Sequence, residues 1–298
     1  MRIRAEIRHA MDRDQPIVAL ESTLLCHGLP YPENLEIASA MEEVVRSEGA
    51  TPATIGVLSG EAVIGLDREQ LERMSKAKAI RKCSRRDLPI VLAQGVDGAT
   101  TVCGTMILAH LAGIRVLATG GIGGVHRGHP FDVSADLEEL ARTPMVVVCS
   151  GAKALLDLAA TRERLETLGV PVLGFGTDQL PAFYSRESGL PADARVDTPE
   201  DVVAVARARD RMGFSASLLV AVPVPPENEL PQREAEQAIA RAVEQADELG
   251  VHGGAVTPFL LSKIAQLTGA RSVLANRSLL VNNARIAARI AKAFTTAP

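Results

Sequence analysis

Short apolar runs alternate along the chain with longer segments in which apolar residues recur every three or four positions. The runs are typical of buried β-strands, and the periodic segments are typical of amphipathic α-helices. We predict strands or short strand-like segments at residues 17–20, 54–58, 62–65, 79–83, 115–118, 145–149, 171–173 and 217–222. We predict helices at residues 33–48, 101–111, 153–168, 235–249, 258–267 and 279–294, and one more that Asp197 caps.

The alternation of buried strands with helices indicates the fold class. It predicts a three-layer α/β/α sandwich around a mostly parallel, mixed sheet. The Ser59-Gly60 pair predicts a hairpin between two of the strands. We expect residues 1–298 to form a single domain with a short lead-in at residues 1–15. The segment 176–194 is rich in Pro, Gly and Ser, and it is either a linker or an excursion within that domain.

The composition excludes several classes of function. Among 298 residues there are six Phe, two Tyr and no Trp, and the formal net charge is −4. A nucleic-acid partner is therefore not expected, because such proteins use basic surfaces and stacking rings. No apolar run is long enough for a membrane span, and the charged N-terminal stretch does not resemble a signal peptide. The four widely spaced cysteines indicate reduced thiols, so we expect a soluble cytoplasmic protein.

Two residues with candidate chemistry follow predicted strands. Glu21 is either a general acid or base, or a strand-end carboxylate bonded to backbone N–H groups. Lys153 comes shortly after the Met-Val-Val-Val-Cys strand, past Gly151 and Ala152. Burial and a neighbouring cation lower the pKa of an amine from its usual value of ~10.4, and a neutral amine can form a Schiff base. The alternative for Lys153 is a salt bridge to Asp157.

Three further segments are candidates for binding a ligand, two of them for a phosphate or another anion. Residues 81–86 carry four cations, among them Lys82, and they either bind a phosphate monoester or form a solvated helix start that Ser84 or Asp87 caps. Val102 follows two threonines before an apolar helix, where backbone N–H groups bind an anion or Thr caps the helix. Four glycines at positions 120, 121, 123 and 124 permit positive φ and close backbone approach, and His126 follows them.

The stretch Asp132-Val133-Ser134-Ala135-Asp136 is a candidate metal and ribose site. If it is helical, the two carboxylates face the same way, one as a ligand of Mg²⁺ or Mn²⁺ and one as an acceptor for a ribose hydroxyl. Alternatively the stretch begins a helix, with Asp132 or Ser134 as the cap and Asp136 near the helix dipole. The two interpretations are compatible.

These segments together resemble the pseudouridine-5′-phosphate glycosidases, also called the indigoidine synthase A-like family. The resemblance covers nearly the whole chain, because the matching stretches run in the family's order. They are ALEST, HGLPYP, SRRDLP, GATTV, ATGGIGGVHRG, FDVSADL, CSGAK, TPFLL and NN.

The resemblance implies reversible cleavage of the C–C glycosidic bond of pseudouridine 5′-phosphate to uracil and ribose 5-phosphate. It implies that Lys153 forms an imine with C1′ of the opened ribose and that Glu21 donates the proton. It also implies a Mn²⁺ ion on Asp132, with Mg²⁺ as the alternative, and a homotrimer. The substrate-binding residues that it implies are Lys82, Val102, His126, Ser134, Ala135, Asp136 and Asn276.

Rival functions remain open at this point. Another Schiff-base phosphosugar lyase or aldolase would need the same lysine and phosphate site. A sugar kinase would require ATP, and a non-catalytic nucleotide-binding sensor would bind the nucleotide without converting it. The few aromatic residues predict that the phosphate and ribose are bound strongly, and the uracil only by hydrogen bonds and small apolar side chains.

Overall fold

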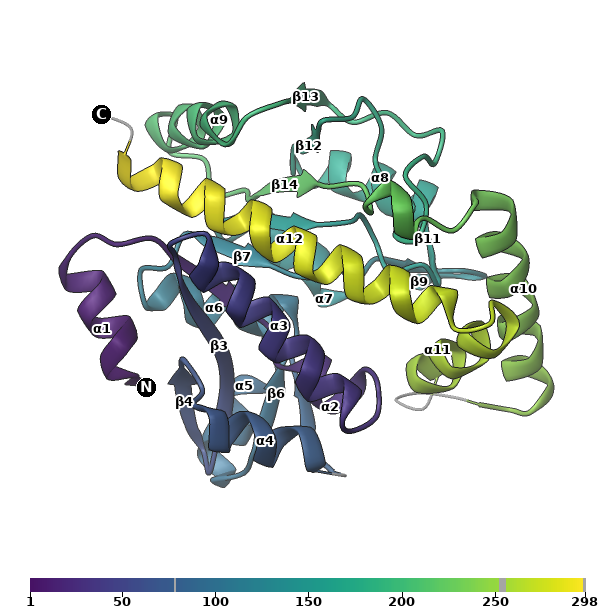
Figure 1. Ribbon diagram of the computed structural model, residues 1–298, viewed down its shortest axis with the longest axis horizontal. Helices are drawn as coiled ribbons and strands as arrows, with labels where there is room; N and C mark the ends of the chain where they lie inside the picture. Colours follow the sequence, from purple (N-terminus) through teal and green to yellow (C-terminus); the bar gives the residue numbers. More distant parts are fainter. Residues whose placement is uncertain (78, 252–255, 297–298) are drawn as a thin grey trace.

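The computed structural model of the protein describes residues 1–77, 79–251 and 256–296 (Figure 1). Eleven strands of this part form one sheet, with the order β1-β4-β3-β2-β7-β10-β14-β12-β13 and with β6 and β5 branching from β3. They are β1 (Arg2–Ile3), β2 (Ile17–Leu20), β3 (Thr51–Leu58), β4 (Glu61–Ile64), β5 (Arg81–Cys83), β6 (Gly98–Thr100), β7 (Val116–Ala118), β10 (Val146–Cys149), β12 (Val172–Phe175), β13 (Ala194–Val196) and β14 (Leu218–Ala221).

The direction of the strands confirms the predicted fold class. All pairs in this sheet are parallel except those of β3 with β4 and with β6. The predicted hairpin is present between β3 and β4, and both Ser59 and Gly60 at its turn have positive φ. A second, three-stranded sheet contains β11 (Leu156–Asp157), β8 (Val125–His126) and β9 (His129–Val133).

Helices cover both faces of the large sheet because alternate residues of its central strands are apolar on both sides. Val146 and Val148 of β10 belong to one core cluster, and Val147 and Cys149 belong to the other. The first cluster lies under α3 (Glu33–Ser47), α9 (Pro199–Arg211) and the long α12 (Arg271–Thr296), which crosses the sheet in Figure 1. The second lies under α1 (Ala5–Asp12), α6 (Val102–Leu111), α7 (Ala135–Leu140) and α8 (Leu158–Thr167).

The remaining helices lie at the ends of the sheet. Helix α2 (Thr23–His27) and α4 (Arg68–Lys76) pack beside β3 and β4, and α5 (Leu88–Gln94) follows β5. Helix α10 (Gln232–Glu248) and α11 (Val256–Leu267) lie together on the right of Figure 1, after the short η1 (Pro226–Asn228). The side chains of residues 256–258, where the TPFLL stretch begins, lie outside the described part. Within the described residues, no helix combines the length and apolar character needed to cross a bilayer.

Several helix starts differ from the predictions, and a cause is visible at α8, α9 and α12. Helix α8 begins at Leu158 rather than at residue 153, because Asp157 caps it by accepting from Ala160 N at 2.9 Å. Helix α9 is capped by Thr198 rather than Asp197, in a capping box with Asp201. Helix α12 begins at Arg271 rather than at residue 279, and buried Ala275 extends its apolar stripe towards the N-terminus.

The segment 176–194 is an excursion within the large sheet, because it joins the neighbouring strands β12 and β13. It contributes Phe183 and Tyr184 to the core, with ring centroids 4.8 Å apart. Phe183 N donates to the carbonyl of Ser150, so the excursion lies against the end of β10. At the other end of the chain, residues 1–15 supply β1 and α1, with Ile7 in the core.

Candidate active site

The carboxyl ends of three neighbouring strands bring predicted site residues together. Leu20 of β2 and Val148 of β10 are both in register with Ala118 of β7, so the residues that follow these strands share one edge of the sheet. Glu21 follows β2, and its half-buried carboxylate accepts from the hydroxyls of Thr119 and Thr23. One alternative predicted for Glu21 was a carboxylate bound by backbone N–H groups. In the structure two hydroxyl groups donate to this carboxylate instead.

Asn283 is a buried polar residue of the NN stretch, and no role for it was predicted. It is fully buried on α12, and its Nδ2 donates to the carbonyl of Thr119 at 2.9 Å. Ser150 Oγ lies 3.2 Å from its Oδ1, so Asn283 joins the ends of β7 and β10. The signal in the sequence was an Asn in the apolar stripe of a helix, between Leu279 and Ala287. A buried amide needs hydrogen-bond partners, and the buried ends of β7 and β10 supply them at Thr119 and Ser150.

Lys153 lies in the turn after β10 and not in a helix. Gly151 has φ +87°, and a Cβ there would meet the carbonyl oxygen of Pro181 at 2.2 Å, so only glycine fits this turn. The backbone of Lys153 is fixed by donation from its N–H to the carbonyl of Ile122 at 3.0 Å. Among the described residues no ion pair joins Lys153 to Asp157, which serves as the α8 cap instead.

The four glycines after β7 permit close packing. None of them adopts the positive φ that glycine would permit. A Cβ on Gly123 would lie 2.1 Å from Ser134 Oγ, and one on Gly124 would lie 2.3 Å from Thr161 Oγ1. The run therefore brings the backbone after β7 against α7 and α8.

Asp136 connects three segments of the site. Its carboxylate is buried and accepts from Cys103 N and from Gly123 N, both at 2.8 Å. These amides belong to the first turn of α6 and to the glycine run. The prediction that Asp132 and Asp136 share a helix face is wrong, because Asp132 lies on β9 while Asp136 is in the first turn of α7.

The four cations at residues 81–86 have different partners. Arg81 and Arg86 both pair with Asp87, and Arg85 binds buried Glu139 through two hydrogen bonds of 2.7 Å. Lys82 forms no ion pair within 4 Å in the described part of the chain. Lys82 is therefore the cation of this segment that is available to a ligand.

The charges around Lys82 identify its neighbours. The side chain of Lys82 is exposed, yet many protein atoms lie around it and displace part of the water. This desolvation is the largest cause of the lowered pKa of Lys82. The positive charge of Lys153 lowers the pKa of Lys82 further, whereas the charges of Asp136 and Glu21 raise it. Four side chains from distant parts of the sequence thus interact electrostatically at one place.

His27 of α2 also lies near Lys82. Desolvation and then the charge of Lys82 lower the pKa of His27, so the imidazole is neutral near pH 7. Its Nε2 is buried and has no hydrogen-bond partner among the described residues. This histidine is the first residue of the HGLPYP stretch, and no role for it was predicted from the sequence.

The other predicted binding residues lie at helix starts or further along α12. Val102 is buried and opens α6, where Thr101 caps the helix by accepting from Gly104 N. Ser134 caps α7 by accepting from Asp136 N at 3.2 Å, and Ala135 is the exposed first residue of that helix. Asn276 is half-buried on α12, and in the described part of the chain no hydrogen bond joins it to the other site residues.

Asp132 is the candidate metal ligand, and its surroundings fit a cation bound mostly by water. Its side chain is 68% exposed, and one carboxylate oxygen lies 3.8 Å from His126 Nδ1. In the residues that the structure describes, no three His, Cys, Asp or Glu side chains converge to hold a metal ion. An exposed carboxylate can bind Mn²⁺ or Mg²⁺ if water supplies the remaining oxygens.

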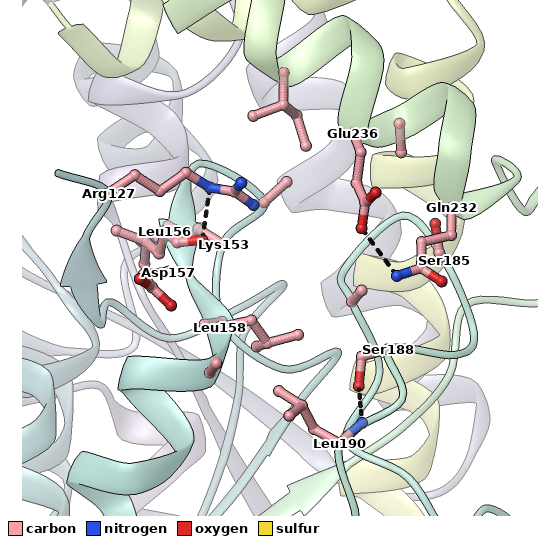
Figure 2. Close-up of a pocket in the computed structure, with 16 residues that line it drawn as sticks. Arg127, Lys153, Leu156, Asp157, Leu158, Ser185, Ser188, Leu190, Gln232 and Glu236 are labelled. Atoms are coloured by element: carbon pink, nitrogen blue, oxygen red, sulfur yellow. Dashed lines mark hydrogen bonds between the residues drawn. The ribbon is translucent and has the colours of Figure 1, made fainter.

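A cavity of about 300 Å³ adjoins Lys153 (Figure 2). It lies between the turn after β10, the loop that contains Ser185 and Ser188, and the first half of α10. Arg127 extends from one wall, and Gln232 and Glu236 extend from α10 on the opposite wall. Among the described residues that line it, Lys153 is the one that was predicted as a site residue.

Comparison with known proteins determines the family. The family model described as indigoidine synthase A like protein matches residues 6–293. The chain belongs to the indigoidine synthase A-like family. Relatives named pseudouridine-5′-phosphate glycosidase include one from Paracoccus denitrificans, 55% identical over 98% of this chain and 97% of its own length. Another, from Methylobacterium nodulans, is 54% identical over 97% of this chain and 86% of its own length.

Two solved structures have the same fold as this chain. A prealnumycin C-glycosynthase in complex with ribulose 5-phosphate has a TM-score of 0.90 and 40% identity, covering 98% of this chain and 96% of that one. An indigoidine synthase A-like protein from Thermotoga maritima has a TM-score of 0.90 and 39% identity, covering 99% and 96%. The resemblance inferred from the sequence is therefore confirmed.

Proposed function

We propose that the protein is a pseudouridine-5′-phosphate glycosidase that reversibly cleaves the C–C bond between ribose and uracil. The observation that carries this proposal is that Glu21 and Lys153 follow neighbouring strands at one edge of the sheet, where the charges of Lys153, Asp136 and Glu21 all act on Lys82. Relatives that share about half of this sequence have that activity in their names. The C-glycosynthase structure contains a related five-carbon sugar phosphate, ribulose 5-phosphate.

The reaction needs a way to break a carbon–carbon bond. Lys153 Nζ forms a bond to C1′ while the C1′–O4′ bond breaks and O4′ takes a proton. The electron pair of the nitrogen then forms an imine with C1′ as the C1′–C5 bond breaks. The electrons of the broken C1′–C5 bond pass to C5 of uracil. Glu21, as the acid, delivers the proton that C5 needs, and water hydrolyses the imine to release ribose 5-phosphate and Lys153.

The other site residues bind the sugar phosphate in this proposal. Lys82 supplies a positive charge to the phosphate, and the backbone N–H of Val102 at the start of α6 donates to it. Ser134, Ala135 and Asp136 at the start of α7 border the ribose, together with His126 and Asn276. Asp132 would hold a Mn²⁺ ion, with Mg²⁺ as the alternative, and the bound ion would supply positive charge near the phosphate.

The test is turnover of pseudouridine 5′-phosphate, followed by the release of uracil on chromatography, with and without added Mn²⁺. Release of uracil and ribose 5-phosphate in equal amounts supports the proposal. Stoichiometric binding without product would instead indicate a sensor, and a requirement for ATP would indicate a kinase. The family resemblance also supports a homotrimer, for which light scattering should give three times the 31.5 kDa mass of one chain.

A further inference from the structure

The strand that carries Lys82 is held by the sheet on one side only. Among the described strands, β5 pairs with β6 and with no other. Where β5 ends, the N–H of Thr101 donates to the carbonyl of Cys83 at 3.0 Å, which joins the strand to the start of α6. Because β5 is a three-residue edge strand, the place of Lys82 depends on what else holds the chain that follows it.

Arg85 holds this following chain to α7. It lies three residues after Lys82, and its Nε and Nη2 donate to the two carboxylate oxygens of Glu139, each at 2.7 Å. This bidentate geometry fixes a guanidinium in both plane and direction. The side chain of Glu139 is 1% exposed, whereas that of Arg85 is 52% exposed. An arginine at the surface therefore reaches a carboxylate inside the protein.

Glu139 has further partners that fix its carboxylate. The hydroxyl of Thr143 donates to Oε1, and the thiol of Cys103 donates to Oε2 at 3.6 Å. Glu139 also follows Asp136 by three residues, so both lie on one face of α7. Asp136 accepts from the first turn of α6 and from the glycine run. This face of α7 therefore binds three segments of the candidate site, and Glu139 binds the one next to Lys82.

We infer that Arg85 and Glu139 are positioning residues that hold Lys82 at the phosphate of the substrate. In this role Arg85 acts through Lys82 and does not bind the ligand itself. The role rests on the proposed function, which assigns Lys82 to the phosphate. The bidentate contact of Arg85, rather than its charge alone, then determines the affinity for the sugar phosphate.

Calorimetry with ribose 5-phosphate measures this affinity without requiring turnover. Arg85→Lys keeps a positive charge beside Glu139 but removes the bidentate contact. The Kd for ribose 5-phosphate should rise roughly tenfold, and the KM for pseudouridine 5′-phosphate should rise with it. The kcat should change less than about twofold, because the reacting groups lie on other segments.

Arg164→Lys is the matched control. Arg164 pairs with Glu138 of the same helix at 2.6 Å, but this contact joins α7 to α8 and leaves the chain after β5 untouched. Both side chains of the pair are about two-fifths exposed. The Kd and the KM of this variant should stay within about twofold of the wild-type values, because such surface pairs contribute little.

Two further variants separate positioning from other roles. Arg85→Lys added to Lys82→Ala should raise the Kd by less than about twofold over Lys82→Ala alone, because no ammonium is left to position. The double variant Arg85→Gln/Glu139→Gln removes both charges together, so no buried carboxylate loses its partner. Its Kd should rise as in Arg85→Lys, and circular dichroism should match the wild type.

The outcomes distinguish the positioning role from the proposed function. An active wild type whose Kd is unchanged in Arg85→Lys and in the double amide variant overturns the positioning role alone. A full further rise on top of Lys82→Ala also overturns it, because Arg85 would then act independently of Lys82. A wild type that binds ribose 5-phosphate but releases no uracil removes the proposed function, while calorimetry still decides the role of the pair. A wild type that does not bind ribose 5-phosphate removes both.

Discussion

Replacing Asp136 by Asn tests whether this carboxylate organises the candidate site. Both its oxygens accept backbone N–H groups at 2.8 Å, one from Cys103 and one from Gly123, and the residue is 4% exposed. Asparagine has one carbonyl oxygen, so one buried N–H would face an NH₂ group. A hydrogen bond to a charged group contributes about 1.5–3 kcal/mol, and we expect the free energy of unfolding to fall by about that amount.

Urea unfolding followed by circular dichroism, at one protein concentration, measures this loss. The matched control is Glu138→Gln, an acid-to-amide change in the same helix. Its carboxylate is 39% exposed and pairs with Arg142 at 3.5 Å and Arg164 at 2.6 Å. Such surface pairs contribute about 0–1 kcal/mol each, so the control should lose clearly less stability than Asp136→Asn.

The same variant should also shift the pH dependence of activity. The negative charge of Asp136 raises the pKa of Lys82, against desolvation and the charge of Lys153, which lower it. Without that charge the pKa of Lys82 falls further. If the protonated ammonium binds the phosphate, the alkaline decline of kcat/KM should move to lower pH in Asp136→Asn. Stability equal to that of the control, together with an unmoved alkaline decline, would refute this reasoning.

Three other predictions concern the lysine, the metal and the base. Lys153→Ala should abolish uracil release while circular dichroism stays as in wild type, because the turn is held by backbone hydrogen bonds; an active variant would contradict the mechanism. Removing divalent ions with a chelator should lower activity that Mn²⁺ restores, and Asp132→Asn should weaken that Mn²⁺ response; an unaltered response would place the ion elsewhere. Calorimetry should show free uracil binding much more weakly than ribose 5-phosphate, since the chain has few aromatic rings that could stack on the base, and equal affinities would count against this.

The sheet could be predicted from the sequence because its central strands are buried on both faces. Residues 17–20 were predicted and observed as a strand with the same limits, and the run at residues 145–149 gives β10. Helix starts were less predictable, since the α8 cap depends on whether Asp157 bonds to Ala160 or to Lys153. Both partners lie close in the sequence, and local pattern alone does not distinguish them.

The placement of some candidate residues could be predicted from the sequence, but the contacts between them could not. Strand ends placed Glu21 and Lys153 at one edge of the sheet, as expected for parallel strands. The sequence could not show that Asp136 accepts hydrogen bonds from two backbone amides or that Arg85 pairs with Glu139. These contacts join segments that are far apart in the chain. Asn283 belongs to the NN stretch of the resemblance, but no role was predicted for it, because a polar residue in a helix pattern is usually assigned to solvent.

The central claim is that Lys153 forms the imine, and chemical trapping tests it most directly. Wild-type protein incubated with ribose 5-phosphate is reduced with borohydride and digested, and its peptides are analysed by mass spectrometry. Lys153→Arg provides the control that cannot form the adduct. The account predicts one reduced sugar-phosphate adduct on the peptide that contains Lys153. An adduct on Lys82 instead, or none from a preparation that releases uracil, would contradict it.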